Sequence, residues 1–553
     1  MSGRSMLSNL AVAKYANAIR SAPRSVICNR ALLISSLLYA LSAIPMTWDQ
    51  GSSSVVPSLP GFQNHFSITS GANPEQIRNF VSLVYIGYSV GAALSFFIND
   101  NIGRLQSYRL YVAIWSIGQI IAITTPNVAG LYAARIVSGI GIGALSVSGP
   151  MSLAEIAPTE IRGLLTSWYV VAMGLSLFTS IFCVYGIYLH VAVGRIQYQI
   201  AFFAPVIFMA LCLFCTYGFS EESPRWLMMV GKKEQALTVL ARLRGLPLDH
   251  PRVQQEIVDI DASVRSLGGE ERPTFLALAK ETFTKKTNLR RLQQTVVSYA
   301  LAQLSGANSI TSYFVPYVNI ISPGGGTTRN IFLSGMYGFS KFWFSLISSF
   351  LFIDALGRRN SLFIGTALQA ISDIYIGAFV KCQQDGSVST AASQGAIAML
   401  FVHAFGYAVG LLTLPYVFGG ELWPNHIRSF GGALSQTFHW LFIYAMKFSV
   451  PSLLKETDDW GAFIFFASWC LISLVYVFFC VPEVAGLSVE EIEEVFKGSW
   501  FNAYKRSKAA IWQGVEDQEL ARNTSTKNNL VETEWEVPLA ASAEKESKGA
   551  ATM

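Results

Sequence analysis

Residues 135–163, RIVSGIGIGALSVSGPMSLAEIAPTEIRG, indicate how the chain is organised. The stretch begins with an arginine inside an apolar run and ends where charged residues and prolines replace the apolar ones. The spacing of this charged end recurs far downstream. The two copies are Glu155, Pro158 and Arg162, and Glu421, Pro424 and Arg428. Two apolar helices with matching charged ends predict two related halves, an organisation found in many transporters.

The composition predicts a membrane protein. Of 553 residues, 52% are hydrophobic and only 14% are charged, too little charge to cover a soluble chain of this length. Apolar segments of roughly 18–28 residues can each cross the bilayer core as a helix. We expect twelve, at residues 31–48, 80–98, 108–125, 128–149, 164–189, 199–219, 292–320, 331–353, 360–381, 395–419, 430–453 and 460–481. The predicted fold class is an all-α membrane protein with twelve transmembrane helices.

The basic residues set the expected orientation. Five of them, and no acid, precede the first span: Arg4, Lys14, Arg20, Arg24 and Arg30. Other basic residues fall in alternate loops, whereas the loops between these are short and nearly uncharged, or acidic. The positive-inside rule therefore predicts cytoplasmic termini, and we expect a multi-pass protein of the plasma membrane. The net charge of +5 follows from this loop bias, so no nucleic-acid partner is expected.

The apolar segments divide the chain into five expected parts. These are a cytoplasmic segment 1–30, a first six-helix half 31–219, a cytoplasmic helical linker 220–291, a second six-helix half 292–481 and a cytoplasmic tail 482–553. Because the first thirty residues lack an apolar core, we expect the first span to serve as the insertion signal. The tail is polar, and we expect it to be largely disordered after about residue 500. The polar stretch 52–77 is expected to be an extracellular loop.

Three ionisable residues in or beside predicted spans are candidates for a functional role. Asp49 follows the first span, Arg135 lies in the fourth and Asp373 in the ninth. An ionisable group at membrane depth is a functional hypothesis by default. The alternatives are that Asp49 caps the end of its span and that Arg135 reaches the nearer interface. Asp373 has no obvious partner, and we expect it to have a solvated or interhelical role.

Amides and aromatic residues in the second half predict a binding site for a hydroxylated solute. Gln303 and Asn308 lie five residues apart, about 140° around a helix, so only a wide cavity or a broken helix would expose both. Amide groups beside aromatic rings suit neutral hydroxylated ligands, although they also bridge helices. Tyr416, His439 and Trp440 are candidates to face the same cavity.

A short loop motif also occurs twice. Its copies are Asp100, Gly103 and Arg104, and Asp354, Gly357 and Arg358. Each lies between consecutive spans on the same predicted side, where glycine permits a tight turn and arginine pairs with carboxylates at helix ends. The six histidines are scattered, and no nucleophile triad or phosphate loop is evident. We therefore expect no enzyme, no metal and no cofactor.

These motifs together resemble the sugar porter family of the major facilitator superfamily, most closely its fungal members, over roughly residues 30–497. The resemblance implies two six-helix bundles around a central site that opens alternately to each side. It also implies gating roles for the charged motifs. The gating residues are Asp100, Gly103, Arg104, Glu155, Arg162, Glu222, Arg225, Asp354, Gly357, Arg358, Glu421, Arg428 and Glu483.

The resemblance further implies proton coupling through Asp49 and Arg135. Protonating the acid removes its pairing with the arginine, so proton occupancy can bias the two conformations. Some uniporters of the family keep the acid, so this reading leaves uniport open. Gln303, Asn308 and Tyr313 match positions that bind sugar hydroxyls or close over them.

Several positions depart from the family pattern and change the expected pocket. Val170 stands where the family usually has a sugar-binding glutamine, and Ala302, Ser312, Tyr416 and His439 also replace typical residues. Each lost hydrogen-bond partner costs about 1–3 kcal/mol. The pocket therefore favours a less hydroxylated, more apolar solute, and His439 suits an acidic one.

The sequence thus predicts a secondary active transporter of a sugar or sugar-like solute, working by proton symport. The alternatives are a facilitative uniporter, an exporter of a specialised metabolite, and a transporter-like nutrient sensor. The expected partners are a sugar, polyol or related solute, protons and the lipid bilayer, with the protein acting as a monomer.

Overall fold

The computed structural model describes residues 19–20, 23–68, 74–265, 274–349, 358–386, 388–412, 422–423, 427–483, 495–496 and 504–509. The chain divides into two compact units, residues 1–478 and 479–553. Regular structure in the described residues is helical throughout, which confirms the predicted all-α fold.

Six helical stretches form the first half of the first unit. They are α3 (Arg24–Ile27) with α4 (Arg30–Ala40), the 3-10 turn η1 (Leu41–Ala43), α5 (Ile44–Val55) and the turn η2 (Val56–Ser58); α7 (Pro74–Ser82) with α8 (Val84–Ile102); α9 (Arg104–Thr124); α10 (Val128–Ile156); α11 (Arg162–His190); and α12 (Ile196–Phe219). The short helix α6 (Pro60–Phe66) lies between the first two stretches. Capping residues fix the starts of several helices: Asn127, for example, accepts a hydrogen bond from Gly130 N–H at 2.8 Å.

The expected loop at 52–77 is wrong over most of its length. The helix of the first span continues through Asp49 to Val55, and α6 follows. Hydroxyl groups make this polar stretch compatible with a buried helix, because they bond back to carbonyls of the preceding turn. Ser54 Oγ donates to Gly51 O at 2.7 Å, and Ser52 and Ser53 are buried as well.

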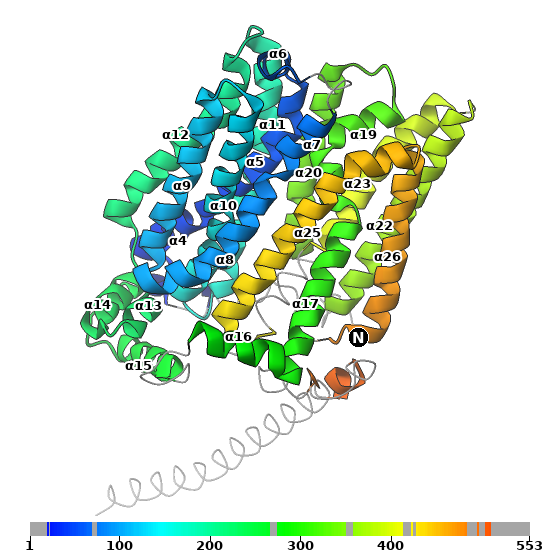
Figure 1. The fold of residues 1–553 in the computed structure, drawn as a ribbon. Helices are drawn as coiled ribbons and strands as arrows, with labels where there is room; N and C mark the ends of the chain where they lie inside the picture. Colours follow the sequence, from blue (N-terminus) through cyan, green and yellow to red (C-terminus); the bar gives the residue numbers. More distant parts are fainter. Residues whose placement is uncertain are drawn as a thin grey trace, which may run out of the picture. The chain divides into compact units, whose positions relative to one another are not determined.

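Four short helices follow the sixth span: α13 (Pro224–Met229), α14 (Lys233–Arg244), α15 (Pro251–Arg265) and α16 (Phe275–Thr284). Figure 1 shows them at one end of the helical array, which we call the linker end. Arg244 of α14 connects α14 and α15 to the span α10. Its guanidinium pairs with Glu256 of α15 and donates to Ile156 O, at the end of α10, at 2.9 Å.

The second half contains α17 (Lys286–Leu304), α18 (Ala307–Ser312), α19 (Phe314–Ile321), α20 (Thr327–Ile347), α22 (Arg358–Gln384), α23 (Thr390–Val409), α25 (Arg428–Glu456) and α26 (Trp460–Cys480). The predicted seventh span is therefore three helices in succession. By length and composition, eight helical stretches of the described residues can cross a membrane. The remaining predicted spans correspond to α9, α17–α19, α20 and α25, so the twelve-span topology is consistent with the structure.

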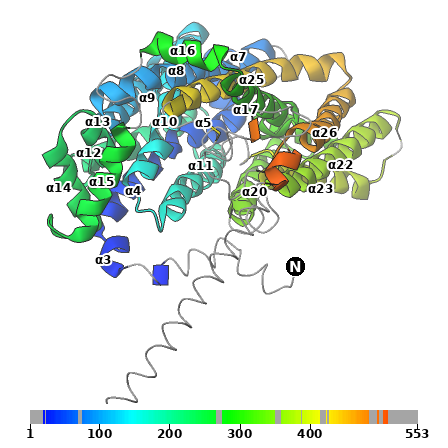
Figure 2. The same ribbon diagram turned by 90° about the horizontal axis from the view of Figure 1, so that it is seen from below.

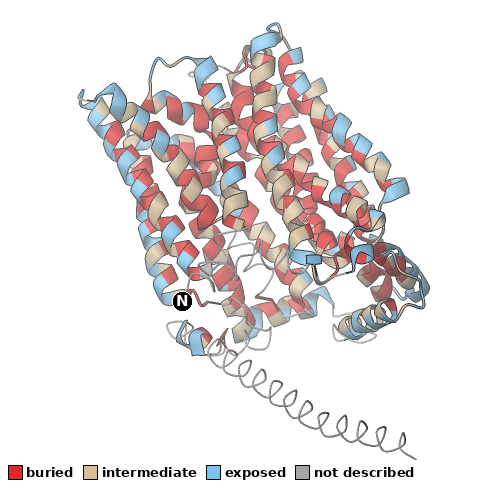
Figure 3. Cartoon of the chain, turned by 180° about the vertical axis from the view of Figure 1, so that it is seen from behind, coloured by how far each residue is buried: buried red, intermediate tan, exposed pale blue. Residues whose placement is uncertain are grey.

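The two halves pack against each other reciprocally. Span two contacts span eleven through α8 and α25, and span five contacts span eight through α11 and α20. Seen along the helices, the two halves lie side by side (Figure 2). Buried residues line the inward faces of the spans, whereas exposed and half-buried ones lie on the outward faces (Figure 3). The many exposed large apolar side chains, such as Phe214 and Leu211 on α12, suit contact with lipid.

Within the first half, α8 and α10 approach backbone to backbone. A Cβ added to Gly87 would lie 2.8 Å from Gly139 Cα, and one added to Gly139 would lie 2.2 Å from Val84 O. Small residues permit this close helix packing.

Candidate functional site

A cavity of about 1330 Å³ lies between the two halves. Its lining runs from Arg225 and Glu256 of the linker helices inward to Gln50 and Asn308. At the opposite end, a continuous cluster of buried apolar residues joins the halves and includes Phe62, Phe80, Tyr313, Phe314, Tyr317 and Phe463. The cavity therefore extends to the linker end, and apolar packing seals the other end.

Polar and aromatic side chains form the innermost part of this cavity, which we call the inner chamber. It is lined by Gln50, Tyr85, Asn308, Lys341, Tyr407 and Lys447. Trp440 extends this wall, with its ring centroid 4.7 Å from that of Tyr88 and 6.2 Å from that of Tyr85. The chamber thus combines hydrogen-bonding groups with flat apolar surfaces, the usual composition of a small-molecule site.

Asp49 and Arg135 form a buried ion pair beside the inner chamber. Arg135 donates through Nη2 to Asp49 Oδ2 at 3.1 Å and through Nη1 to Oδ1, a bidentate arrangement. Its Nε also donates to Phe80 O at 3.0 Å. Asp49 lies within α5 rather than beyond its end, and its neighbours Thr47 and Gln50 line the cavity. The structure thus brings the two ionisable residues of spans one and four together.

The break in span seven brings the two predicted amides together. Gly306, with φ of +80°, separates α17 from α18, and Asn308 Nδ2 donates to Gln303 Oε1 at 2.7 Å. Asn308 also contacts Tyr407 Oη at 3.4 Å and Gln50 Nε2 at 3.4 Å. Asn308 lines the cavity and Gln303 lies behind it, buried.

The other predicted binding residues divide into two groups. Val170, His439 and Trp440 line the cavity. Tyr313 instead lies in the apolar cluster at the sealed end, where its hydroxyl donates to Lys447 O at 2.9 Å. Tyr416 lies outside the described residues.

Two lysines that the motifs do not point to line the inner chamber. Lys341 Nζ donates to Thr311 Oγ1 at 2.9 Å, and Lys447 Nζ donates to Tyr85 Oη at 2.5 Å. Both side chains are buried. The signal was available, because a lysine within an apolar span is rare unless it has a function.

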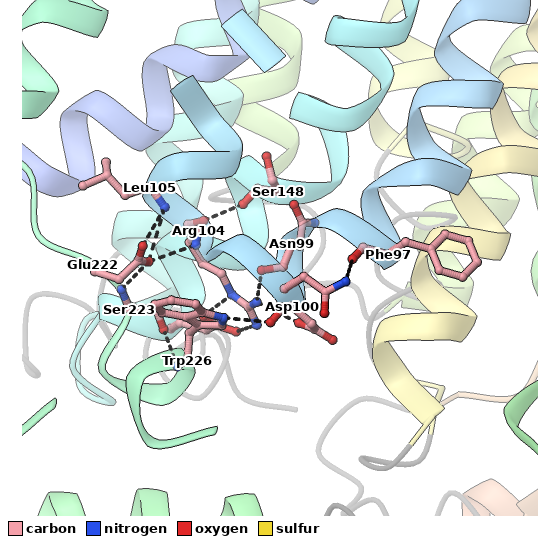
Figure 4. A network of polar contacts seen from close by, with 12 residues as sticks. Phe97, Asn99, Asp100, Arg104, Leu105, Ser148, Glu222, Ser223 and Trp226 are labelled. Carbon is pink, nitrogen blue, oxygen red and sulfur yellow. Dashed lines mark hydrogen bonds and ion pairs between the residues drawn. The ribbon is translucent and has the colours of Figure 1, made fainter. Parts of the chain in front are cut away.

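The charged motif at the linker end forms a compact network (Figure 4). Arg104 binds Glu155 bidentately, with both N–O distances 2.9 Å, and Asp100 at 2.7 Å. The Glu222 carboxylate accepts from the backbone N–H groups of Arg104 at 2.9 Å and Leu105 at 3.1 Å. This network joins α8, α9 and α10 to the chain entering the linker.

Glu222 is mostly buried at this junction. Burial raises its pKa above the ordinary value, although the backbone N–H groups of Ser223, Leu105 and Arg104 and the Arg104 charge act in the opposite direction. Trp226 Nε1 donates to Asp100 O at 3.0 Å and helps cover the site. Gly103, with φ of +97°, forms the turn between α8 and α9.

The structure describes some of the remaining predicted gating residues. Arg162 and Arg225 line the linker end of the cavity, and Arg225 donates to Ser263 Oγ at 3.2 Å. Arg428 Nε donates to Trp423 O at 3.4 Å. In the second unit, Glu483 N–H donates to Ser507 Oγ at 3.2 Å. Asp354, Gly357, Glu421 and the side chain of Arg358 lie outside the described part of the chain.

Asp373 has a partner that the sequence did not suggest. Its Oδ2 lies 3.4 Å from Nε2 of His403 on α23, and both side chains are fully buried. The same His403 nitrogen lies 3.1 Å from Ser305 O at the break in span seven. Gln369 donates to Ser305 Oγ at 3.1 Å. The interhelical role expected for Asp373 agrees with this placement.

Comparison with known proteins gives consistent matches. The family model described as sugar (and other) transporter matches residues 36–496. A quinate permease of Emericella nidulans is 28% identical over 486 residues, which are 86% of this chain and 90% of that protein. The hexose transporter HXT13 of Saccharomyces cerevisiae is 28% identical over 482 residues, 84% of this chain and 82% of that one.

Solved structures match the fold. The proton:xylose symporter XylE bound to 6-bromo-6-deoxy-D-glucose superposes with a TM-score of 0.69 at 20% identity, covering 84% of this chain and 99% of the other. A partially occluded inward open conformation of the E. coli xylose transporter gives a TM-score of 0.68 at 21% identity, with 83% and 99% covered.

Proposed function

The chain belongs to the sugar (and other) transporter family of the major facilitator superfamily, and from this premise we propose that it is a proton-coupled secondary transporter. It moves a sugar-like organic solute by alternating access. The linker end faces the cytoplasm, and the protein resides in the plasma membrane as a monomer.

The ion pair between Asp49 and Arg135 is the observation that carries the proton-coupling proposal. A buried pair is stable only while both partners remain charged and bonded. Protonating Asp49 removes the counter-charge of Arg135. The arginine charge is then buried without a partner, which is energetically unfavourable. Because α5 carries Asp49 between cavity-lining residues, this change acts on the helix that contacts the solute.

The uneven closure of the cavity supports alternating access. The chamber connects to the linker end, and the apolar cluster around Tyr313 and Phe80 seals the opposite end. Exchange between this state and one with the seal opened would carry a solute across the membrane. The matched relatives carry quinate or hexoses in their names, and both are hydroxylated ring compounds.

Uptake by the Asp49→Asn variant tests the proposal. In cells lacking related carriers, we expect the wild type to accumulate solute against its gradient at acidic external pH and to lose this ability when an uncoupler is added. Asp49→Asn should abolish accumulation and its pH dependence, because the amide cannot exchange a proton. Counterflow of preloaded solute should persist, since it needs no net proton movement.

Asp49→Glu is the matched control because it keeps an ionisable carboxyl group. It should retain a pH-dependent component that Asp49→Asn lacks. If wild-type uptake never exceeds equilibration and ignores the uncoupler, the protein is a facilitative uniporter. If solute leaves preloaded cells against its gradient, the protein is an exporter.

A further inference from the structure

Two buried lysines in the inner chamber face no carboxylate of the residues that the structure describes. Lys341 comes from α20 and Lys447 from α25, and their side chains are 8% and 1% exposed. Among the residues that the structure describes, no acid lies within 4.0 Å of either ammonium group. An ammonium group has three N–H donors, and each lysine has one hydrogen bond, to the Thr311 or Tyr85 hydroxyl.

The nearby acid does not neutralise these cations. Asp49 already pairs with Arg135, so this pair carries no net charge. The described acids that line the cavity are Asp100, Glu155, Glu256 and Asp259. They lie on α8, α10 and α15 toward the linker end, where Arg104 already binds the first two. The two lysines of the inner chamber are thus left without a described carboxylate of their own to pair with.

Aromatic rings stabilise the two ammonium groups only in part. Lys447 Nζ lies 4.0 Å from the centroid of the Tyr85 ring, and Lys341 Nζ lies 5.6 Å from that of Tyr407. A cation over an aromatic face gains attraction. However, two charges taken out of water remain costly without an anion.

Both lysines adjoin the groups that suit a hydroxylated solute. The Tyr407 ring lies beside Lys341, and its hydroxyl contacts Asn308 at 3.4 Å. The Tyr85 ring lies beside Lys447 and stacks toward Trp440. Cationic, amide and aromatic groups therefore converge on one chamber.

We propose that the substrate is a hydroxylated ring compound bearing a carboxylate, which Lys341 and Lys447 bind while Asn308 and its amide neighbours bind the hydroxyl groups. This inference rests on the proposed transport function and specifies its substrate class. The solute carboxylate supplies an anion that the described lining of the chamber does not offer to the two lysines. Neutral hexoses lack this group and bind weakly.

Matched pairs of acidic and neutral compounds test the proposal without any mutation. The pairs are quinate with its methyl ester, and glucuronate with glucuronamide, in which the neutral partner keeps the ring and hydroxyls. Binding to the purified full-length protein is measured from ligand-induced thermal stabilisation. For at least one pair, we expect the acid to bind about tenfold or more tightly than its neutral partner, because a charge-assisted hydrogen bond is lost with the charge.

Variants assign this preference to the lysines. Lys341→Gln and Lys447→Gln should each reduce the acid-to-neutral ratio, whereas Lys341→Arg and Lys447→Arg should restore part of it. A purely structural role would weaken both members of a pair equally. Gln436→Ala is a control, because Gln436 lines the cavity and contacts Tyr299 Oη at 3.3 Å without carrying charge.

The results separate this inference from the transport proposal. If both neutral partners bind as tightly as their acids, or the lysine variants leave the ratio unchanged, the carboxylate assignment is wrong even where uptake is observed. If the acids bind selectively but no solute crosses the membrane, the assignment holds and the transport proposal fails.

Discussion

At the residue scale, the buried pair of Asp373 and His403 shows how strongly one side chain depends on another. The two groups lie 3.4 Å apart and fully buried. Removing one member of a buried polar pair leaves the other without its partner and costs about 1–3 kcal/mol. Replacing both with apolar residues of similar volume costs far less.

We therefore expect His403→Leu to lower the thermal unfolding temperature of the purified protein markedly. The double variant Asp373→Leu/His403→Leu should recover part of that loss, and a double-mutant cycle measures the coupling. Additive losses in the two single variants would show that the pair contributes no interaction energy.

The residue scale also shows where the sequence is informative. Asp49 and Arg135 can be recognised from the sequence as candidate functional residues, because a charge in an apolar segment needs a partner. In the structure the two residues pair with each other. Lys341 and Lys447 obey the same rule, yet lie outside any repeated motif. The sequence cannot supply the distance between groups on different helices, so the placement of both lysines in one chamber is seen only in the fold.

At the scale of the element, the break in span seven depends on Gly306. Its positive φ is a conformation that residues with a Cβ rarely adopt. A Cβ there would also lie 2.6 Å from the Phe466 ring. The sequence left two ways to expose Gln303 and Asn308, a wide cavity or a broken helix. Spacing alone cannot choose between them, because the break is stabilised by contacts with α26.

Gly306→Ala should therefore destabilise the protein by about 1–2 kcal/mol or more and impair solute binding, because Asn308 would shift from its present partners. Gly186→Ala is the matched control, since Gly186 lies within α11 and a Cβ added there would meet open space. Thermal unfolding and ligand-induced stabilisation measure the two effects. Equal behaviour of the two variants would contradict the requirement for glycine at 306.

At the scale of the whole molecule, the linker-end network ties stability to pH through Glu222. Burial raises the folded-state pKa of this carboxyl group above its ordinary value of about 4.5. A raised folded pKa means that the folded protein favours the protonated form. The stability that this group contributes is thus fully present below the unfolded pKa and is lost as pH rises through the folded pKa.

The comparison of wild type with Glu222→Gln isolates this effect. The glutamine keeps an acceptor oxygen for the backbone N–H groups and cannot ionise. We expect the unfolding temperature of the wild type, relative to the variant, to fall as pH rises above about 4.5. Ser220→Ala, a neutral substitution nearby, should leave the pH profile unchanged. A wild-type advantage that grows with pH would reverse the predicted sign.

The topology of the whole molecule could be predicted more fully than its site. Apolar segment lengths and the repeated motifs were sufficient for twelve spans in two halves, and the matched family and folds agree. The prediction of a loop after Asp49 was wrong because serines are typical of loops. In this buried helix their hydroxyl groups instead bond back to carbonyls of the preceding turn. The role of Tyr313 at the sealed end likewise required the packing of both halves.

The backbone contact of Gly87 with Gly139 has a mechanical consequence. Neither α8 nor α10 can slide or roll on the other without a steric clash, so the two helices move as one rigid body. This rigid pair of helices contains Arg135 within α10 and the Asp100 and Glu155 network at its linker end. Any rocking of the first half would therefore move Arg135 together with the Asp100 and Glu155 network, and the bending would fall outside α8 and α10.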